Sequence, residues 1–154
     1  MLQAGILHGD LKSENILIEP STLKIKLIDF GSAQLIESSP QQKPNKSSNT
    51  KLVKTFRGTN LYKPPEYLMN KCFYPRPSTV WTIGVILYDM IYGIFPFKND
   101  SEIMEHKNKE LKFSSKIYSS PGFKNLVKSC LAFYVADRIS IDKILSDEWM
   151  TSNE

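Results

Sequence analysis

The sequence has little cysteine, and its longest apolar run is unsuited to a membrane. The two cysteines, Cys72 and Cys130, are far apart and lack metal-type spacing, which excludes a disulfide framework and a zinc site and predicts free thiols. The most apolar run, residues 80–97, contains Asp89, and an acidic residue at a bilayer centre costs about 2.5–3.5 kcal/mol. We therefore expect a buried helix there. With no signal-peptide pattern at the start, we expect a location in the cytoplasm or nucleus and no membrane partner.

The sequence also lacks a concentrated basic region. The net charge is only +4, and the lysines and arginines are scattered rather than gathered beside aromatic residues, so we expect no nucleic-acid partner. A chain of 154 residues that is 41% hydrophobic is typical of one domain with one core.

What the sequence does contain is a predicted β-hairpin between two acidic residues. Two apolar, β-branched runs, residues 16–18 and 24–28, flank a turn that contains a proline. Asp10 precedes this hairpin and Asp29 follows it directly. Antiparallel pairing returns the chain to its starting point, so we expect Asp29 to lie near Asp10 and Asn15.

Such a cluster suits phosphoryl transfer, which needs a metal clamp on phosphate oxygens and a carboxylate that accepts the proton of the attacking hydroxyl. Oxygen ligands suit Mg²⁺, so Asn15 and Asp29 are the candidate metal ligands. Asp10 is then the candidate base, and Lys12 would place a positive charge beside the transferred phosphate. The spacing matches the pattern H-x-D-x-x-x-x-N followed by D-F-G. Either triplet alone is weak, since each also occurs in ordinary polar turns.

Elsewhere the pattern predicts a mainly helical chain. Residues 80–92 are apolar around nearly the whole helix circumference and predict a buried central helix that starts near Pro77 and stops at Gly93. Further helices are expected over residues 100–109 after an Asp100 or Ser101 cap, over 123–132, and after Ser140, with residues 1–7 as the end of a helix. His106 is expected to be solvated. Residues 36–52, polar and rich in Ser and Pro, are expected to form a flexible insertion, and 151–154 a tail.

Along residues 1–150 the chain resembles a partial eukaryotic protein kinase domain, its C-terminal lobe. The resemblance rests on motifs that recur in order: His8-Gly9-Asp10-Leu11-Lys12 with Asn15, Asp29-Phe30-Gly31, Gly58-Thr59, Pro64-Pro65-Glu66, Val80-Trp81-Thr82-Ile83-Gly84 and Asp137-Arg138. It implies a mainly α fold with a small β-hairpin, the large lobe of a kinase, with the N-terminal β-lobe absent.

Within this family the chain is most similar to the Pim serine/threonine kinases of the calmodulin-dependent-kinase-like group. The similarity lies in residues 27–32, in Thr79-Val80-Trp81 and in residues 87–90. It implies transfer of the ATP γ-phosphate to protein Ser or Thr hydroxyls, with Mg²⁺.

The resemblance also implies roles for further residues. Leu17 and Ile28 would form the floor and back of the adenine pocket. Glu14 would attract Arg- or Lys-rich protein substrates. The residues expected at the nucleotide site are Leu17 and Ile28 together with Lys12, Glu14, Asn15 and Asp29. Glu66 and Arg138 would form a buried ion pair.

The sequence departs from the family pattern in two places. Gly9 stands where most kinases have an arginine that pairs with a phosphorylated activation segment, so we expect activity independent of such phosphorylation. Only Gly5 and Gly9 precede Asp10, so no glycine-rich phosphate loop is present, and we expect the chain to be a fragment, through truncation or an incomplete gene model. The alternatives are a catalytically inactive regulatory or scaffold module and a small-molecule phosphotransferase. No oligomeric state is predicted.

Overall fold

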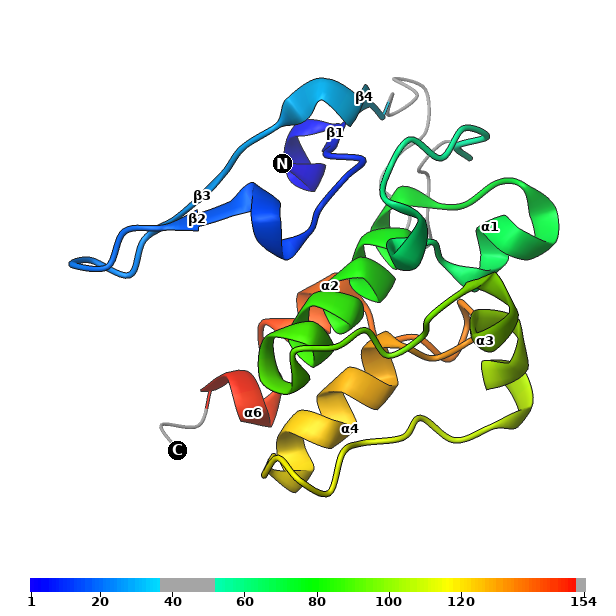
Figure 1. The fold of residues 1–154 in the computed structure, drawn as a ribbon. Coiled ribbons are helices and arrows are strands. Elements are labelled where there is room, and N and C mark those ends of the chain that lie inside the picture. Colours follow the sequence, from blue (N-terminus) through cyan, green and yellow to red (C-terminus); the bar gives the residue numbers. More distant parts are fainter. Residues whose placement is uncertain (37–51, 152–154) are drawn as a thin grey trace.

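The computed structural model describes residues 1–36 and 52–151, which form a mainly helical structure with two small antiparallel sheets (Figure 1). The expected flexible insertion falls on residues 37–51, and residues 152–154 belong to the expected tail; both lie outside the described residues. The α-helices are α1 Pro65–Asn70, α2 Pro75–Tyr92, α3 Asp100–Glu105, α4 Pro121–Cys130, α5 Ile141–Ile144 and α6 Glu148–Thr151. Short 3₁₀ helices are η1 Leu2–Ala4, η2 Ser13–Asn15, η3 Phe30–Ser32, η4 Asn60–Tyr62 and η5 His106–Asn108.

The predicted hairpin is confirmed. Strand β2 (Ile16–Ile18) pairs with β3 (Ile25–Leu27) in antiparallel register, with Ile16 opposite Leu27. In Figure 1 the hairpin projects away from the helices, and its side chains are correspondingly open to solvent: Leu23 in the turn is 71% exposed.

The expectation of a helix end over residues 1–7 holds for its first part only. The short helix η1 ends at Gly5, which at φ +72° adopts a left-handed conformation. The chain then continues as β1 (Ile6–Leu7), which pairs with β4 (Gln34–Leu35). This second sheet holds the segment before Asp10 against the segment after Asp29.

The central helix α2 is confirmed, although it begins at Pro75 rather than near Pro77. Proline fits the first turn of a helix because its missing N–H has no partner there anyway. Gly93, at φ +65°, ends the helix as predicted. Buried side chains lie along most of its length, but Met90, near its C-terminal end, is 69% exposed.

Helix α4 packs closely against α2. A Cβ atom at Gly84 would lie 2.8 Å from the Cβ of Cys130, so the absence of a side chain allows this approach. The main core lies between these helices and the neighbouring loops; its most completely buried members are Trp81, Val85, Val127 and Leu131.

The predictions for the α3 region need correction. Asn99, not Asp100 or Ser101, caps the helix, since its side chain accepts a hydrogen bond from the Glu102 N–H at 2.9 Å. His106 is not solvated: Nε2 lies 2.9 Å from the carbonyl oxygen of Leu131, and the ring centroid lies 5.0 Å from that of Phe97.

Two expectations from composition can be compared with the structure. Cys72 and Cys130 are both free, as predicted. Within residues 1–36 and 52–151, no helix has the length and apolar character needed to cross a membrane.

Candidate active site

Asp10 lies in the loop between β1 and β2, and the path of this loop depends on Gly9. Gly9 has φ +85°, and a Cβ atom there would lie 2.2 Å from the carbonyl oxygen of Ser32. The strand pairing of Leu7 with Gln34 brings these two segments together. A side chain at position 9 therefore has no room, and glycine is needed for both its conformation and its size.

His8 is fully buried and connects the Asp10 loop to the residue before Asp29. Its Nδ1 lies 3.3 Å from the Asp10 N–H, and its Nε2 lies 3.0 Å from the carbonyl oxygen of Ile28. If the ring accepts from Asp10 at Nδ1, Nε2 carries the proton and donates to Ile28. One buried imidazole thus links the backbones next to both carboxylates.

Asn15 makes a second connection between the same segments. Its side-chain NH₂ group donates to the backbone carbonyl oxygen of Asp10 at 2.9 Å. Its backbone carbonyl oxygen accepts from the Ile28 N–H at 3.0 Å. The residue is only 5% exposed. Since Ile28 precedes Asp29 directly, these bonds bring the backbones of positions 10, 15 and 28 together next to Asp29.

Asp29 adopts a left-handed conformation, with φ +59°, in which few non-glycine residues occur. One carboxylate oxygen, Oδ1, accepts a hydrogen bond from the Gly31 N–H at 3.2 Å. The residue is exposed, so its second carboxylate oxygen remains open to a ligand. Strained backbone at such a position is typical of functional sites.

The Asp10 carboxylate is held by Thr59, which follows Gly58. The Thr59 N–H and hydroxyl both donate to Oδ1, at 2.8 and 2.9 Å, and the Lys12 amino group lies 3.4 Å from Oδ2. The same amino group lies 3.4 Å from the Thr59 hydroxyl oxygen. Partial burial raises the pKa of Asp10, but the Thr59 hydrogen bonds and the charge of Lys12 outweigh it and leave the pKa below its ordinary value.

The other predicted nucleotide and substrate residues lie on or beside the hairpin. Leu17 on β2 is 49% exposed, and Ile28, just after β3, is half-buried. Glu14 is exposed in η2, where the Ser13 hydroxyl lies 3.1 Å from its carboxylate and 3.4 Å from that of Asp89.

Glu66 and Arg138, the pair implied by the resemblance, form a buried bidentate ion pair. The two guanidinium nitrogens donate to the two Glu66 oxygens, each at 2.9 Å, and the side chains are 1% and 8% exposed for Arg138 and Glu66. Arg138 also donates to the carbonyl oxygen of Pro77 at 2.9 Å and lies 5.2 Å from the Trp81 ring centroid. The pair fixes the segment after Thr59 to α2.

Sequence reasoning did not assign the structural roles of Thr59 and His8. Thr59 was noted only as part of a motif, and its contact with Asp10 spans 49 positions, which no local periodicity reveals. Among the described residues, no three His, Cys, Asp or Glu side chains cluster as a metal site. The predicted ligand pair has only one such residue, Asp29, so phosphate and water oxygens would have to complete any coordination.

Comparison with known proteins identifies the family. The protein kinase domain model matches residues 1–150. The chain is 38% identical over 146 residues to the serine/threonine-protein kinase pim-2 of Danio rerio, covering 95% of this chain and 42% of that protein. It is 35% identical to prk-2 of Caenorhabditis elegans, covering 97% and 31%, and 36% identical to PSK2 of Saccharomyces cerevisiae, covering 95% and 12%.

The chain thus spans less than half the length of each of these relatives, all three of which are named serine/threonine kinases. The match to pim-2 confirms the predicted resemblance to the Pim type. The chain belongs to the protein kinase family.

Proposed function

We propose that this chain is the C-terminal lobe of a serine/threonine protein kinase that transfers the γ-phosphate of ATP to protein hydroxyls. The observation that carries the proposal is the Asp10 carboxylate, held by both donors of Thr59 and lying beside the Lys12 amino group. The burial of His8 and Asn15 keeps the loop that carries Asp10 in place.

Asp10 is the proposed base. Because the hydrogen bonds from Thr59 and the charge of Lys12 keep its pKa low, the carboxylate is ionised at neutral pH and is ready to accept a hydrogen bond from a substrate hydroxyl. As the hydroxyl oxygen bonds to the γ-phosphorus of ATP, the bond from that phosphorus to the bridging oxygen breaks, ADP leaves with the bonding electrons, and the hydroxyl proton passes to Asp10. Lys12, 3.4 Å from Asp10, stabilises the negative charge of the transferred phosphoryl group.

The donor set of Asn15 and Asp29 fits Mg²⁺. The Asn15 amide nitrogen is occupied by the Asp10 carbonyl oxygen, which leaves its side-chain oxygen as a ligand. Asp29 likewise has one carboxylate oxygen not bonded to Gly31. When bound with ATP, the ion would neutralise charge on the phosphate oxygens.

The hairpin and its flanks supply the proposed binding surfaces. Leu17 and Ile28 offer apolar side chains to the adenine ring of ATP. Glu14 and Asp89, both close to the Ser13 hydroxyl, place two carboxylates near the loop, which favours Arg- or Lys-rich substrates.

To test this proposal, the chain is fused to the segment that precedes the matching region in the Danio rerio kinase. With this chimera, transfer of labelled γ-phosphate to an Arg-rich, Ser-containing peptide is measured. We expect Mg²⁺-dependent transfer, and we expect Asp29→Asn to weaken it while Asp142→Asn, an exposed aspartate beside Arg76, has no effect. Transfer equal in wild type and Asp29→Asn would contradict the assignment. No transfer by the wild-type chimera, with nucleotide still bound, would favour the inactive regulatory module.

A further inference from the structure

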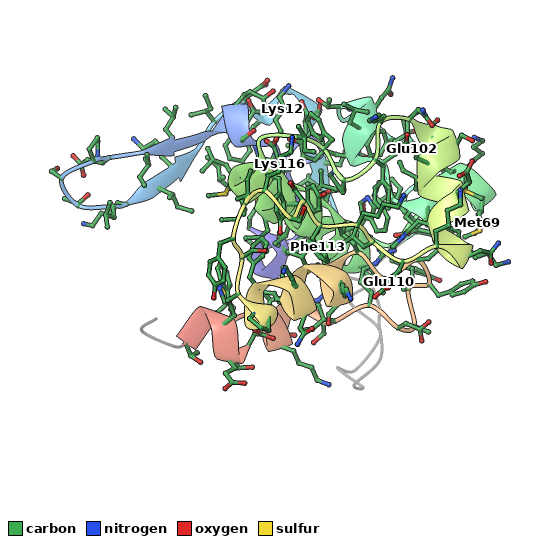
Figure 2. All side chains as sticks on the ribbon, turned by 60° about the horizontal axis from the view of Figure 1, so that its bottom comes forward. Lys12, Met69, Glu102, Glu110, Phe113 and Lys116 are labelled. Carbon is green, nitrogen blue, oxygen red and sulfur yellow. The ribbon has the colours of Figure 1, made fainter. Side chains whose placement is uncertain are left out.

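A groove of about 410 Å³ lies between α3 and two segments, residues 94–98 after α2 and residues 109–112 after η5. Its lining includes none of the proposed catalytic or metal-binding residues. Figure 2 shows Glu102 on α3 and Glu110 on the segment that follows, both of which line the groove. A volume of this size accommodates several side chains of a bound peptide.

The inner surface of the groove is apolar and well ordered. Tyr88, Phe97 and Leu111 line it and are buried, at 5%, 5% and 8% exposure, whereas Ile94 is 56% exposed at its edge. The Tyr88 hydroxyl donates to the carbonyl oxygen of Lys112 at 2.8 Å, which fixes one wall to α2. An apolar side chain entering the groove would therefore meet a preformed floor.

The second wall offers a short stretch of backbone without a backbone partner. Within the part of the chain that the structure describes, residues 110–113 make no backbone–backbone hydrogen bond, although the Lys112 carbonyl oxygen accepts from the Tyr88 hydroxyl. Lys109, which starts this wall, is extended, at φ −127° and ψ 139°. The first wall differs, because residues 94–98 are bent and the Lys98 N–H donates to the Glu102 carboxylate. Backbone N–H and C=O groups without a backbone partner are the groups to which another peptide strand adds.

The charges around the groove favour an acidic ligand. Glu105 is paired with Lys109, Glu110 with Lys128 at 2.7 Å, and the Glu102 carboxylate accepts from the Lys98 N–H at 2.8 Å. Among the described residues, the amino groups of Lys98 and Lys112 have no acidic partner. Glu105 and Glu110 are thus charge-paired, whereas Glu102 has a backbone donor but no cationic partner among the described residues. The two lysines outnumber this one carboxylate, so the balance of unpaired charge in the groove is positive.

We propose that this groove binds an extended acidic segment of a partner protein, which inserts an apolar side chain over Tyr88 and Leu111. Its carboxylates pair with Lys98 and Lys112, and its backbone bonds to residues 110–113. This docking site lies apart from the phosphoryl-transfer residues and does not depend on the proposed function.

The probe is a fluorescein-labelled peptide with the sequence Asp-Glu-Val-Phe-Val-Glu-Asp, titrated with the 154-residue chain and followed by fluorescence anisotropy. We expect saturable binding whose Kd rises about tenfold in the double variant Lys98→Glu, Lys112→Glu. The matched control, Lys24→Glu with Lys26→Glu on the hairpin, should leave the Kd unchanged. Ile94→Ser, which removes an exposed apolar side chain from the edge of the groove without adding charge, should weaken binding without changing the melting temperature.

Hydrogen exchange distinguishes strand addition from simple charge attraction. We expect the peptide to slow amide exchange in residues 110–113, and a peptide with lysine in place of each acidic residue to bind about tenfold more weakly. No saturable binding, an equal Kd in the two lysine double variants, or unchanged exchange in residues 110–113 would each overturn the proposal.

Discussion

A residue far along the chain lowers the pKa of Asp10. Partial burial acts to raise its pKa, and the hydrogen bonds from Thr59, with the positive charge of Lys12, act more strongly to lower it. The carboxylate is consequently deprotonated well below neutral pH. Thr59 touches the reacting group without itself exchanging a proton, so it acts as a positioning residue.

Replacing Thr59 with valine should shift the acidic limb of the pH–rate profile to higher pH. The folded-state pKa of Asp10 is depressed, so activity is present above that pKa and is lost as pH falls through it. Thr59→Val removes one of the two donors to Oδ1, which raises the pKa, and the loss then begins at higher pH. The measurement is kcat/KM against pH in the chimera.

Thr22→Val, in the exposed hairpin turn, is the control and should leave that limb in place. An acidic limb that is the same in Thr59→Val and in wild type would show that the hydroxyl does not tune Asp10.

Gly9 leaves no room for a side chain at its position. The carbonyl oxygen of Ser32 occupies the space where a side chain would begin, so an arginine that pairs with a phosphorylated segment has no place here. The expectation from the sequence, activity independent of such phosphorylation, remains a prediction that phosphatase treatment tests.

At the scale of elements, the contact between α2 and α4 depends on Gly84. The Cβ of Cys130 and a side-chain carbon of Leu131 would each lie 2.8 Å from a Cβ added there. The two helices can approach this closely only because position 84 has no side chain. Both partner atoms are buried in the core, so neither can move aside into solvent.

Gly84→Ala should lower the free energy of unfolding by about 1–3 kcal/mol, as overpacked cores do. Alanine favours a helix over glycine by roughly 1 kcal/mol, which offsets part of the clash without removing it. Urea denaturation followed by circular dichroism measures the change. The free energy of unfolding of Met90→Ala, on the exposed side of the same helix, should stay within about 0.5 kcal/mol of wild type. A Gly84→Ala variant as stable as wild type, or more stable, would contradict the packing argument.

The elements that were predicted correctly are those with a strong local signal. The hairpin has two β-branched runs around a turn, and α2 has an apolar sequence between proline and glycine. The strand at residues 6–7 was not predicted because its partner strand, β4, lies beyond the hairpin and gives no local signal. His106 was placed in solvent because the carbonyl oxygen that it contacts belongs to Leu131, 25 positions away.

The same distinction applies to the candidate site. The spacing of Asp10, Asn15 and Asp29 is visible in the sequence, and the hairpin explains why the segments that carry them lie close together. Thr59 was part of a sequence motif, but its contacts with Asp10 and Lys12 became visible only in three dimensions, since the segment that carries Thr59 has no periodic pattern.

At the scale of the whole molecule, the Glu66–Arg138 ion pair joins segments 72 positions apart. Arg138→Ala should lower the free energy of unfolding by about 3–5 kcal/mol, because it leaves the Glu66 carboxylate buried without its partner. Arg76→Ala breaks an exposed ion pair with Asp142 and should cost about 0–1 kcal/mol. Denaturant unfolding measures the free energy of unfolding of both variants. Equal losses of stability in the two would mean that breaking the buried pair costs no more than breaking the exposed one.

The central claim is that Asp10 acts as the base at a site where the segments carrying Asp10, Asn15 and Asp29 meet. Its most direct test is single-turnover phosphoryl transfer by the Asp10→Asn chimera, with nucleotide affinity measured in parallel. The account predicts loss of transfer by about 10²–10⁴-fold with ATP binding unchanged. Transfer at close to the wild-type rate would contradict it.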